Sequence, residues 1–182
     1  FIFSSTIVFL GLVNFCLIVS VSNIIGWSGI MLREYYQFSE TLAGVGVAGF
    51  LIFETAVRFF GDNLKNRSNS VKLIILCSIA STIAFWGIYL SINVFILFFC
   101  FIVVGFFSGL IQPIIYSLTS KMNGSIEKNM SFVVLFQSTA FLFGPLISGQ
   151  IAKYQDLNNI FLFSSFCMVL VSIFIILYSK LT

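Results

Sequence analysis

Long apolar runs separated by short polar links organise this chain. A helix needs about 20 mostly apolar residues to cross about 30 Å of hydrocarbon, and we find such runs at residues 6–32, 41–60, 72–91, 94–118, 130–152 and 158–179. The stretch from Leu73 to Ser120 carries no charge and is too long for one helix, so we divide it at Ser91-Ile92-Asn93. The pattern predicts an all-α integral membrane protein, a single bundle of six transmembrane helices over residues 1–182.

Composition strengthens this prediction and narrows the function. Hydrophobic residues make up 59% of the chain and charged residues 8%, against about 25% charged in ordinary soluble domains. The sequence contains no histidine, which removes the commonest metal ligand and the usual base of a catalytic triad. We therefore expect no enzyme, no metal and no cofactor. The net charge of +3 is small and dispersed, which argues against nucleic acid as a partner.

The basic residues indicate how the chain is oriented. Arg33 and Lys153 fall on one side of the predicted spans, each near an acid. The opposite side carries six basic residues, namely Lys65, Arg67, Lys72, Lys121, Lys128 and Lys180. Because cytoplasmic loops hold the excess of Lys and Arg, and an even number of spans returns the chain to its starting side, both termini are predicted to be cytoplasmic.

One motif is misleading. The letters GVGVAG, residues 44–49, match the dinucleotide fingerprint G-x-G-x-x-G. That fingerprint must follow a strand and open a soluble βαβ unit, whereas here it lies inside the second apolar run. We interpret its small residues as positions where membrane helices approach closely.

Polar residues recur at helical spacing inside the first, fourth and fifth runs. Such side chains usually face neighbouring helices or a water-filled cavity. Two interpretations stay open, a cavity that holds a solute and interhelical hydrogen bonds without any ligand. The candidate cavity residues are Ser20, Asn23, Trp27, Gln112, Tyr116 and Gln137.

A charged ladder occupies the second run. Glu54, Arg58 and Asp62 are four residues apart, so on one helix they alternate in sign along nearly the same face. A charge at membrane depth is expensive, and an opposite partner at i+4 offsets part of that cost. Glu54 is either a structural partner for Arg58 or a protonatable group.

Three segments together resemble one transporter family. They read GWSGIMLREYYQFSETLAGVGVAGFLIFETAVRFFGDNLKNR (Gly26 to Arg67), GFFSGLIQPIIYSL and FQSTAFLFGPLISGQIA. They are similar to the carboxy-terminal six-helix half of a major facilitator superfamily transporter, and to bacterial inner-membrane members of its fucose-permease-like branch. The resemblance implies a 3+3 inverted repeat, alternating access, a small polar and sugar-like solute, and a multi-pass location in the bacterial inner membrane.

The resemblance also implies a cytoplasmic gate. Gly61, Asp62 and Arg67 match the second copy of the superfamily's gating motif, with Glu54 and Arg58 completing a charge network. The sequence departs from the branch at several positions. Val57 stands where Gly is usual, Asn63 where a basic residue is expected, and Ser68-Asn69 where a Gly is common; Val21 and Gly26 stand where acids are frequent. The last two departures remove the acids through which proton coupling in the first span would run.

Six helices are half of the superfamily's two-half architecture. We expect a second six-helix half from the same longer chain, a separate chain or a homodimer, besides the lipid bilayer and the solute as partners. The first residue is Phe1 rather than Met, and we expect the chain to begin partway into a longer protein or to be a shortened one. The alternatives are a non-transporting membrane interaction or assembly protein and a non-functional transporter remnant. A membrane serine enzyme built on Ser28 or Ser108 lacks a histidine for activation.

Overall fold

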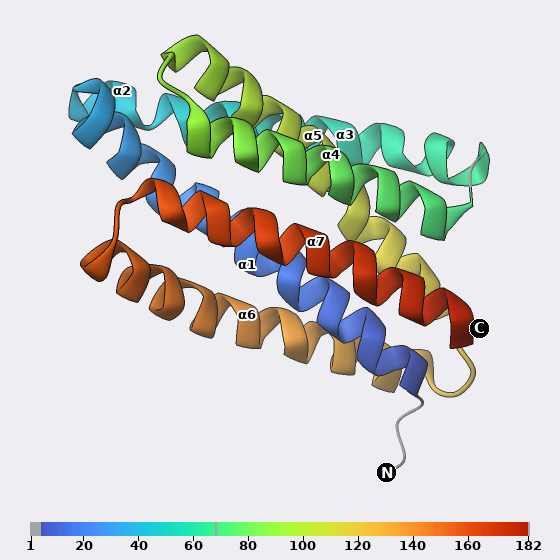
Figure 1. Cartoon of the computed structure of the whole chain (residues 1–182). Coiled ribbons are helices and arrows are strands. Elements are labelled where there is room, and N and C mark those ends of the chain that lie inside the picture. Colours follow the sequence, from blue (N-terminus) through green and yellow to red (C-terminus); the bar gives the residue numbers. More distant parts are fainter. Residues whose placement is uncertain (1–4, 68, 182) are drawn as a thin grey trace.

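Six membrane-spanning elements make up the structure. The computed structural model describes residues 5–67 and 69–181, with no side chains described for residues 60–67. The helices are α1 (Ser5–Tyr36), α2 (Glu40–Ala43), α3 (Val45–Arg67), α4 (Ser70–Leu90), α5 (Val94–Ser120), α6 (Ile126–Tyr154) and α7 (Asn158–Leu181). Six segments are long and apolar enough to cross a membrane, α2 and the first part of α3 counting as one. The predicted all-α membrane fold is confirmed for the described residues (Figure 1).

The ends of the helices follow from local chemistry. Helix α1 runs to Tyr36, beyond the expected end at residue 32, and stops where Gln37 adopts a left-handed conformation with φ 54°. The Gln37 and Phe38 amides then donate to the carbonyls of Arg33 and Leu32. Asn93 caps α5 by accepting a hydrogen bond from the backbone amide of Phe95 at 2.8 Å, which satisfies one of the free donors of the first turn.

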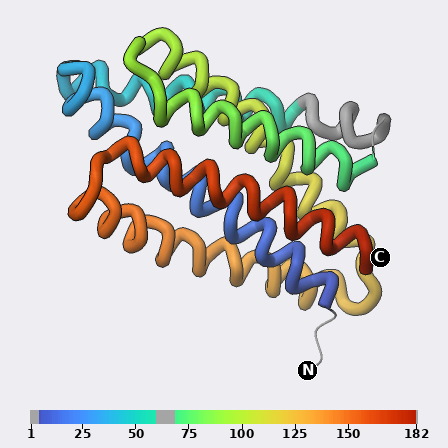
Figure 2. Tube along the Cα trace, viewed as in Figure 1, coloured from blue at the N-terminus to red at the C-terminus, as the bar shows by residue number. Residues whose placement is uncertain are grey.

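The helices pack as two intertwined trios with inverted symmetry. Helix α1 packs against α6 and α7, while α5 packs against α3 and α4, and α4 meets α7. Exchanging α1 with α5, α3 with α6, and α4 with α7 turns the α1–α6 contact into α5–α3 and the α1–α7 contact into α5–α4, and it leaves the α4–α7 contact unchanged. Figures 1 and 2 show both termini at the same end of the molecule. Helix α1 runs away from that end and α5 runs back toward it, so the two helices run in opposite directions. The contacts are those of a 3+3 inverted repeat.

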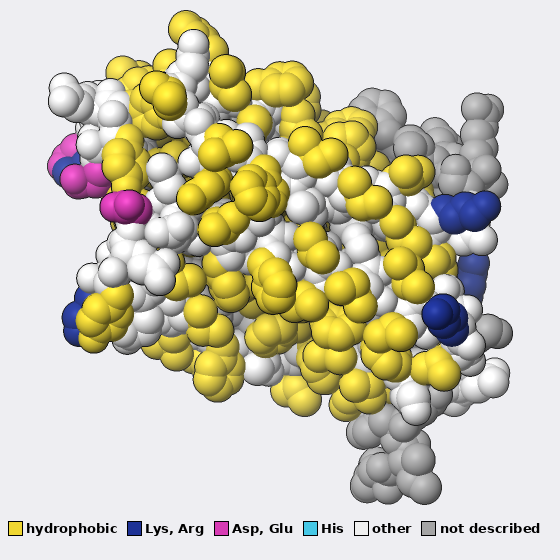
Figure 3. Space-filling model, in the orientation of Figure 1, with side chains coloured by type: hydrophobic (Ala, Val, Ile, Leu, Met, Phe, Trp, Pro, Cys, Tyr) yellow, Lys and Arg dark blue, Asp and Glu magenta, His cyan; other side chains and the backbone are white. Residues whose placement is uncertain are grey.

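Burial is very unequal among the helices. The most apolar window of α1 is 72% buried, against 22% for the α2–α3 span and 17% for α6. Apolar side chains cover the middle of the molecule and charged side chains gather at its two ends (Figure 3). Helix α1 is thus central, whereas α3 and α6 have broad uncovered faces.

Helices α3 and α5 approach each other unusually closely. A Cβ atom added at Gly109 would lie 2.7 Å from the carbonyl oxygen of Glu54, and one added at Gly105 would collide with the carbonyl of Phe50. Only glycine permits this spacing at both positions, as expected for small residues between membrane helices. The close approach fixes the distance between polar groups further along the two helices.

Candidate functional site

A chain of hydrogen bonds crosses from α3 through α5 to α6. Arg58 donates from Nη2 to Oε1 of Glu54 at 2.8 Å and to Oε1 of Gln112 at 3.0 Å. Gln112 donates from Nε2 to the Tyr116 hydroxyl at 3.1 Å and to Oε1 of Gln137 at 3.3 Å. Tyr116 donates to the same Gln137 oxygen at 2.5 Å. We call these five residues the polar chain.

Local sequence places each member of the polar chain. Glu54 and Arg58 are one turn apart on α3, and Gln112 and Tyr116 are one turn apart on α5, so each pair shares a helix face. Gly109 lies three residues before Gln112 on α5. The close contact of Gly109 with α3 brings Arg58 within reach of Gln112. The closeness of two backbones therefore assembles a side-chain cluster.

The charged pair in the polar chain is asymmetric in exposure. The side chain of Glu54 is 11% exposed and that of Arg58 is 45% exposed. The carboxylate thus lies between α3 and α5, and the guanidinium lies at the open side of α3. Gln112, Tyr116 and Gln137 are each half-buried, so the polar chain follows the uncovered side of the bundle.

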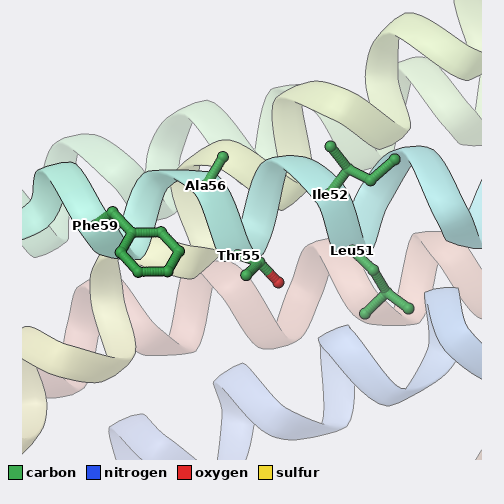
Figure 4. A pocket seen from close by; sticks show the side chains of 5 residues that line it. All are labelled: Leu51, Ile52, Thr55, Ala56 and Phe59. Atoms are coloured by element: carbon green, nitrogen blue, oxygen red, sulfur yellow. The ribbon is translucent and has the colours of Figure 1, made fainter.

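A hollow lies on the exposed face of α3. It measures about 650 Å³ and is lined by Leu51, Ile52, Thr55, Ala56 and Phe59, which project from α3 alone (Figure 4). At about 100° per residue, Leu51 lies about 20° around the helix from the position of Arg58. The other lining residues lie about 60–160° further around the helix, so Arg58 is at one edge of the hollow.

Ser20 and Asn23 are placed elsewhere, inside the packed bundle. Both are buried, with relative exposures of 0% and 1%. Ser20 donates to the carbonyls of Cys16 and Ser164, each at 3.0 Å. Asn23 donates to the Ser164 hydroxyl at 2.9 Å and accepts from Ser148 at 2.6 Å. These bonds hold α1 to α6 and α7, and they do not reach the polar chain.

The remaining predicted residues divide into two groups. Trp27 is half-buried and packs against the hydrophobic core. Gly61, Asp62 and Arg67 belong to the last turns of α3, and their side chains lie outside the described residues. The gate assigned to those three residues stays a prediction.

Sequence reasoning did not single out Ser164. It is buried in α7, accepts the hydrogen bond from Asn23 and donates to the carbonyl of Ile160 at 2.9 Å. A small polar residue in an apolar run was its only signal, and that signal is shared by many serines of this sequence. Its partners become apparent only when α1 and α7 are packed together.

The family follows from comparison with known proteins. A sequence model described as Major Facilitator Superfamily matches residues 10–182, nearly the whole chain. The chain belongs to the Major Facilitator Superfamily. Membership confirms the predicted superfamily.

Two known bacterial proteins resemble the chain in sequence. An uncharacterized MFS-type transporter of Yersinia pestis is 25% identical over 160 residues, which are 85% of this chain and 41% of that protein. The membrane protein MosC of Rhizobium meliloti is 28% identical over 160 residues, 84% of this chain and 38% of that protein. The chain therefore spans about two fifths of the length of these relatives.

A solved transporter shares the fold. The crystal structure of a mutant of the peptide transporter POT, in complex with sulfate, superposes with a TM-score of 0.79 at 13% identity. The match covers 96% of this chain and 37% of that chain. The chain thus has the fold of part of a superfamily transporter, and the finer resemblance to the fucose-permease-like branch stays a prediction.

Proposed function

We propose that this chain forms one half of a secondary transporter that moves a small polar, sugar-like solute by alternating access. The observation that supports it is the polar chain, which links three helices along the uncovered side of the bundle. Polar groups at membrane depth are costly unless they pair or serve a water-filled path. Here the groups pair with one another and still remain partly open.

The solute would bind at Gln112, Tyr116 and Gln137, which present amide and hydroxyl groups at helix interiors. Such groups exchange hydrogen bonds with a polar solute without any covalent step. A solute in this region would contact α5 and α6 together, and α3 through Arg58. Relative movement of these helices would then change its access to either side of the membrane.

A second six-helix half would close the site. Helices α3 and α6 carry large exposed apolar residues, among them Phe59 at 81% and Leu142 at 63%, and α3 has the hollow described above. These surfaces fit a second half, from the same longer chain, a separate chain or a homodimer. The two halves would rock about the solute, and Gly61, Asp62 and Arg67 would latch the cytoplasmic side with Glu54 and Arg58.

We further propose the bacterial inner membrane as the location, with both termini in the cytoplasm. The distribution of lysine and arginine supports this orientation. The resemblance to bacterial members and the bacterial relatives support the location.

Transport with matched glutamine variants tests the proposal. The native protein, with any further chain that it carries, is reconstituted into proteoliposomes and assayed for uptake of a panel of labelled sugars and related small polar solutes. Gln137→Leu removes a member of the polar chain, whereas Gln150→Leu makes the same change at an exposed position of the same helix α6. We expect uptake to be lost in Gln137→Leu and kept in Gln150→Leu. Equal uptake by both variants, or no uptake of any solute by the native protein, would contradict the proposal.

The alternative of a non-transporting assembly protein has one observation in its favour. Half of the six predicted cavity residues do not join the polar chain, and two of those, Ser20 and Asn23, hold helices together. Labelling by a water-soluble thiol reagent distinguishes the alternatives, because the four native cysteines are buried. A cysteine at position 112 or 116 that stays closed in every condition would favour the assembly protein, with position 23 as the buried reference.

A further inference from the structure

The polar chain has unused hydrogen-bonding capacity of one kind. A guanidinium carries five N–H donors, and the two on Nη2 of Arg58 bind Glu54 and Gln112. The donors on Nε and Nη1 bind no residue that the structure describes. The amide nitrogen of Gln137 likewise binds no described residue, since only the side-chain oxygen of Gln137 takes part in the polar chain.

The acceptors of Gln112, Tyr116 and Gln137 are mostly occupied, four of their six lone-pair sites being used. The Gln112 oxygen accepts from Arg58, the Tyr116 hydroxyl accepts from Gln112, and the Gln137 oxygen accepts twice. The remaining acceptor capacity of Glu54 lies on a side chain that is only 11% exposed. The surplus that faces the open side is therefore a surplus of donors.

The positive charge of Arg58 also favours a ligand that supplies acceptors. Arg58 is the only basic residue within the interior of a span among the residues with described side chains, the others lying at or beyond helix ends. Its side chain is 45% exposed on the open face. A ligand that supplies several acceptor atoms and negative charge would complement this site, whereas a ligand rich in donors would leave its N–H groups without partners.

We propose that the solute carries an oxyanion, a carboxylate group, which binds the N–H groups on Nε and Nη1 of Arg58. A guanidinium matches a carboxylate in planar, two-point geometry. Glu54 competes for the same cation, so a bound carboxylate shares Arg58 with Glu54. This inference rests on the proposed transport function and names the class of its solute.

Chemical protection of Arg58 tests the inference directly in the native protein. Phenylglyoxal modifies exposed arginines, and peptide mass spectrometry follows the rate at each one, with Arg33 at a helix end as internal control. The probes are matched pairs, glucuronate with glucose and succinate with succinamide. We expect the carboxylates to slow modification of Arg58 several-fold, with no effect of the neutral partners and none at Arg33. Equal protection by the neutral partners, or no protection by any carboxylate, overturns the inference.

Variants measured for binding give a second test. Glu54→Gln removes the competing carboxylate, and we expect glucuronate to bind more than tenfold more tightly, because like charges a few ångströms apart repel by more than this factor at an effective dielectric constant of about 20. Arg58→Gln should abolish carboxylate binding, whereas Arg33→Gln makes the same change outside the site and should leave it intact. If Arg58→Gln does not fold, Glu54→Gln still decides: unchanged or weaker glucuronate binding contradicts the inference.

Transport assays separate failure of the inference from failure of the transport function. Uptake of a neutral sugar that depends on Gln137 and is unaffected by Arg58→Gln would overturn the carboxylate while leaving transport in place. Absence of uptake of any solute by the native protein, together with protection of Arg58 by carboxylates, would overturn transport and leave an anion-binding site.

Discussion

Replacing Gly109 with alanine should separate α3 from α5 and break the polar chain. The new Cβ would lie 2.7 Å from the carbonyl oxygen of Glu54, against at least 3.4 Å for an ordinary contact. The neighbouring atom belongs to a backbone and cannot rotate away, so the helices must separate by about 0.7 Å at this point. The Arg58–Gln112 bond, 3.0 Å long, would lengthen beyond the range of about 2.7–3.2 Å for an N–H···O bond.

The expected cost can be estimated. Overpacking of a tight interior costs about 1–3 kcal/mol, and replacing a helical glycine by alanine returns about 0.5–1 kcal/mol. Each kcal/mol shifts Tm by about 2–4 °C in a chain of this size. We therefore expect the Tm of the purified protein to fall by several degrees in Gly109→Ala, and uptake of solute to fall with it.

Gly149 of α6 provides the matched control. A Cβ added there meets no atom within 4 Å, so Gly149→Ala should keep or raise the Tm through helix propensity alone. The assay is thermal unfolding of both variants in the same detergent, combined with uptake in proteoliposomes. If Gly109→Ala is as stable and as active as Gly149→Ala, the close approach of α3 and α5 does not support the polar chain.

Three further variants test separate features. Asn23→Leu should lower the Tm, because two interhelical hydrogen bonds are lost and such bonds contribute about 0.6 kcal/mol each on average. Solute affinity should persist in this variant, and loss of affinity at unchanged Tm would place Asn23 in the cavity instead. Tyr116→Phe removes the hydroxyl that joins Gln112 and Gln137, and should weaken solute binding by roughly fivefold, as expected for about 1 kcal/mol; equilibrium binding checks this, and unchanged affinity would remove Tyr116 from the site. Ser78→Ala removes the 2.7 Å bond between α4 and α7 and should lower the Tm slightly without any change in uptake.

Much of the fold could be predicted from the chain because apolar length and turn chemistry are local. The uncharged stretch from Leu73 to Ser120 predicted two helices, and the structure ends α4 at Leu90 and begins α5 at Val94 after the cap by Asn93. The i, i+4 spacing of Glu54 and Arg58 likewise anticipated an ion pair, which is present at 2.8 Å. Both inferences required only neighbours along the chain.

The composition of the site could be predicted only in part. The sequence assigned Arg58 to a gate and Gln112 to a cavity, because nothing local relates two residues that are 54 positions apart. Their hydrogen bond depends on the glycine contacts between α3 and α5, which are tertiary. Ser20 and Asn23 were predicted in the cavity and lie inside the packed bundle, apart from the polar chain. Their helical spacing fits a cavity wall and an interhelical contact equally well, and only the position of Ser164 on α7 distinguishes these two interpretations.

Accessibility of position 137 from each side of the membrane tests the central claim most directly. Gln137→Cys is labelled with a membrane-impermeant maleimide in right-side-out and in inside-out vesicles. A half-transporter whose polar chain faces an alternating cavity predicts labelling from both sides. Labelling from neither side, or from one side only in every condition, would contradict the account.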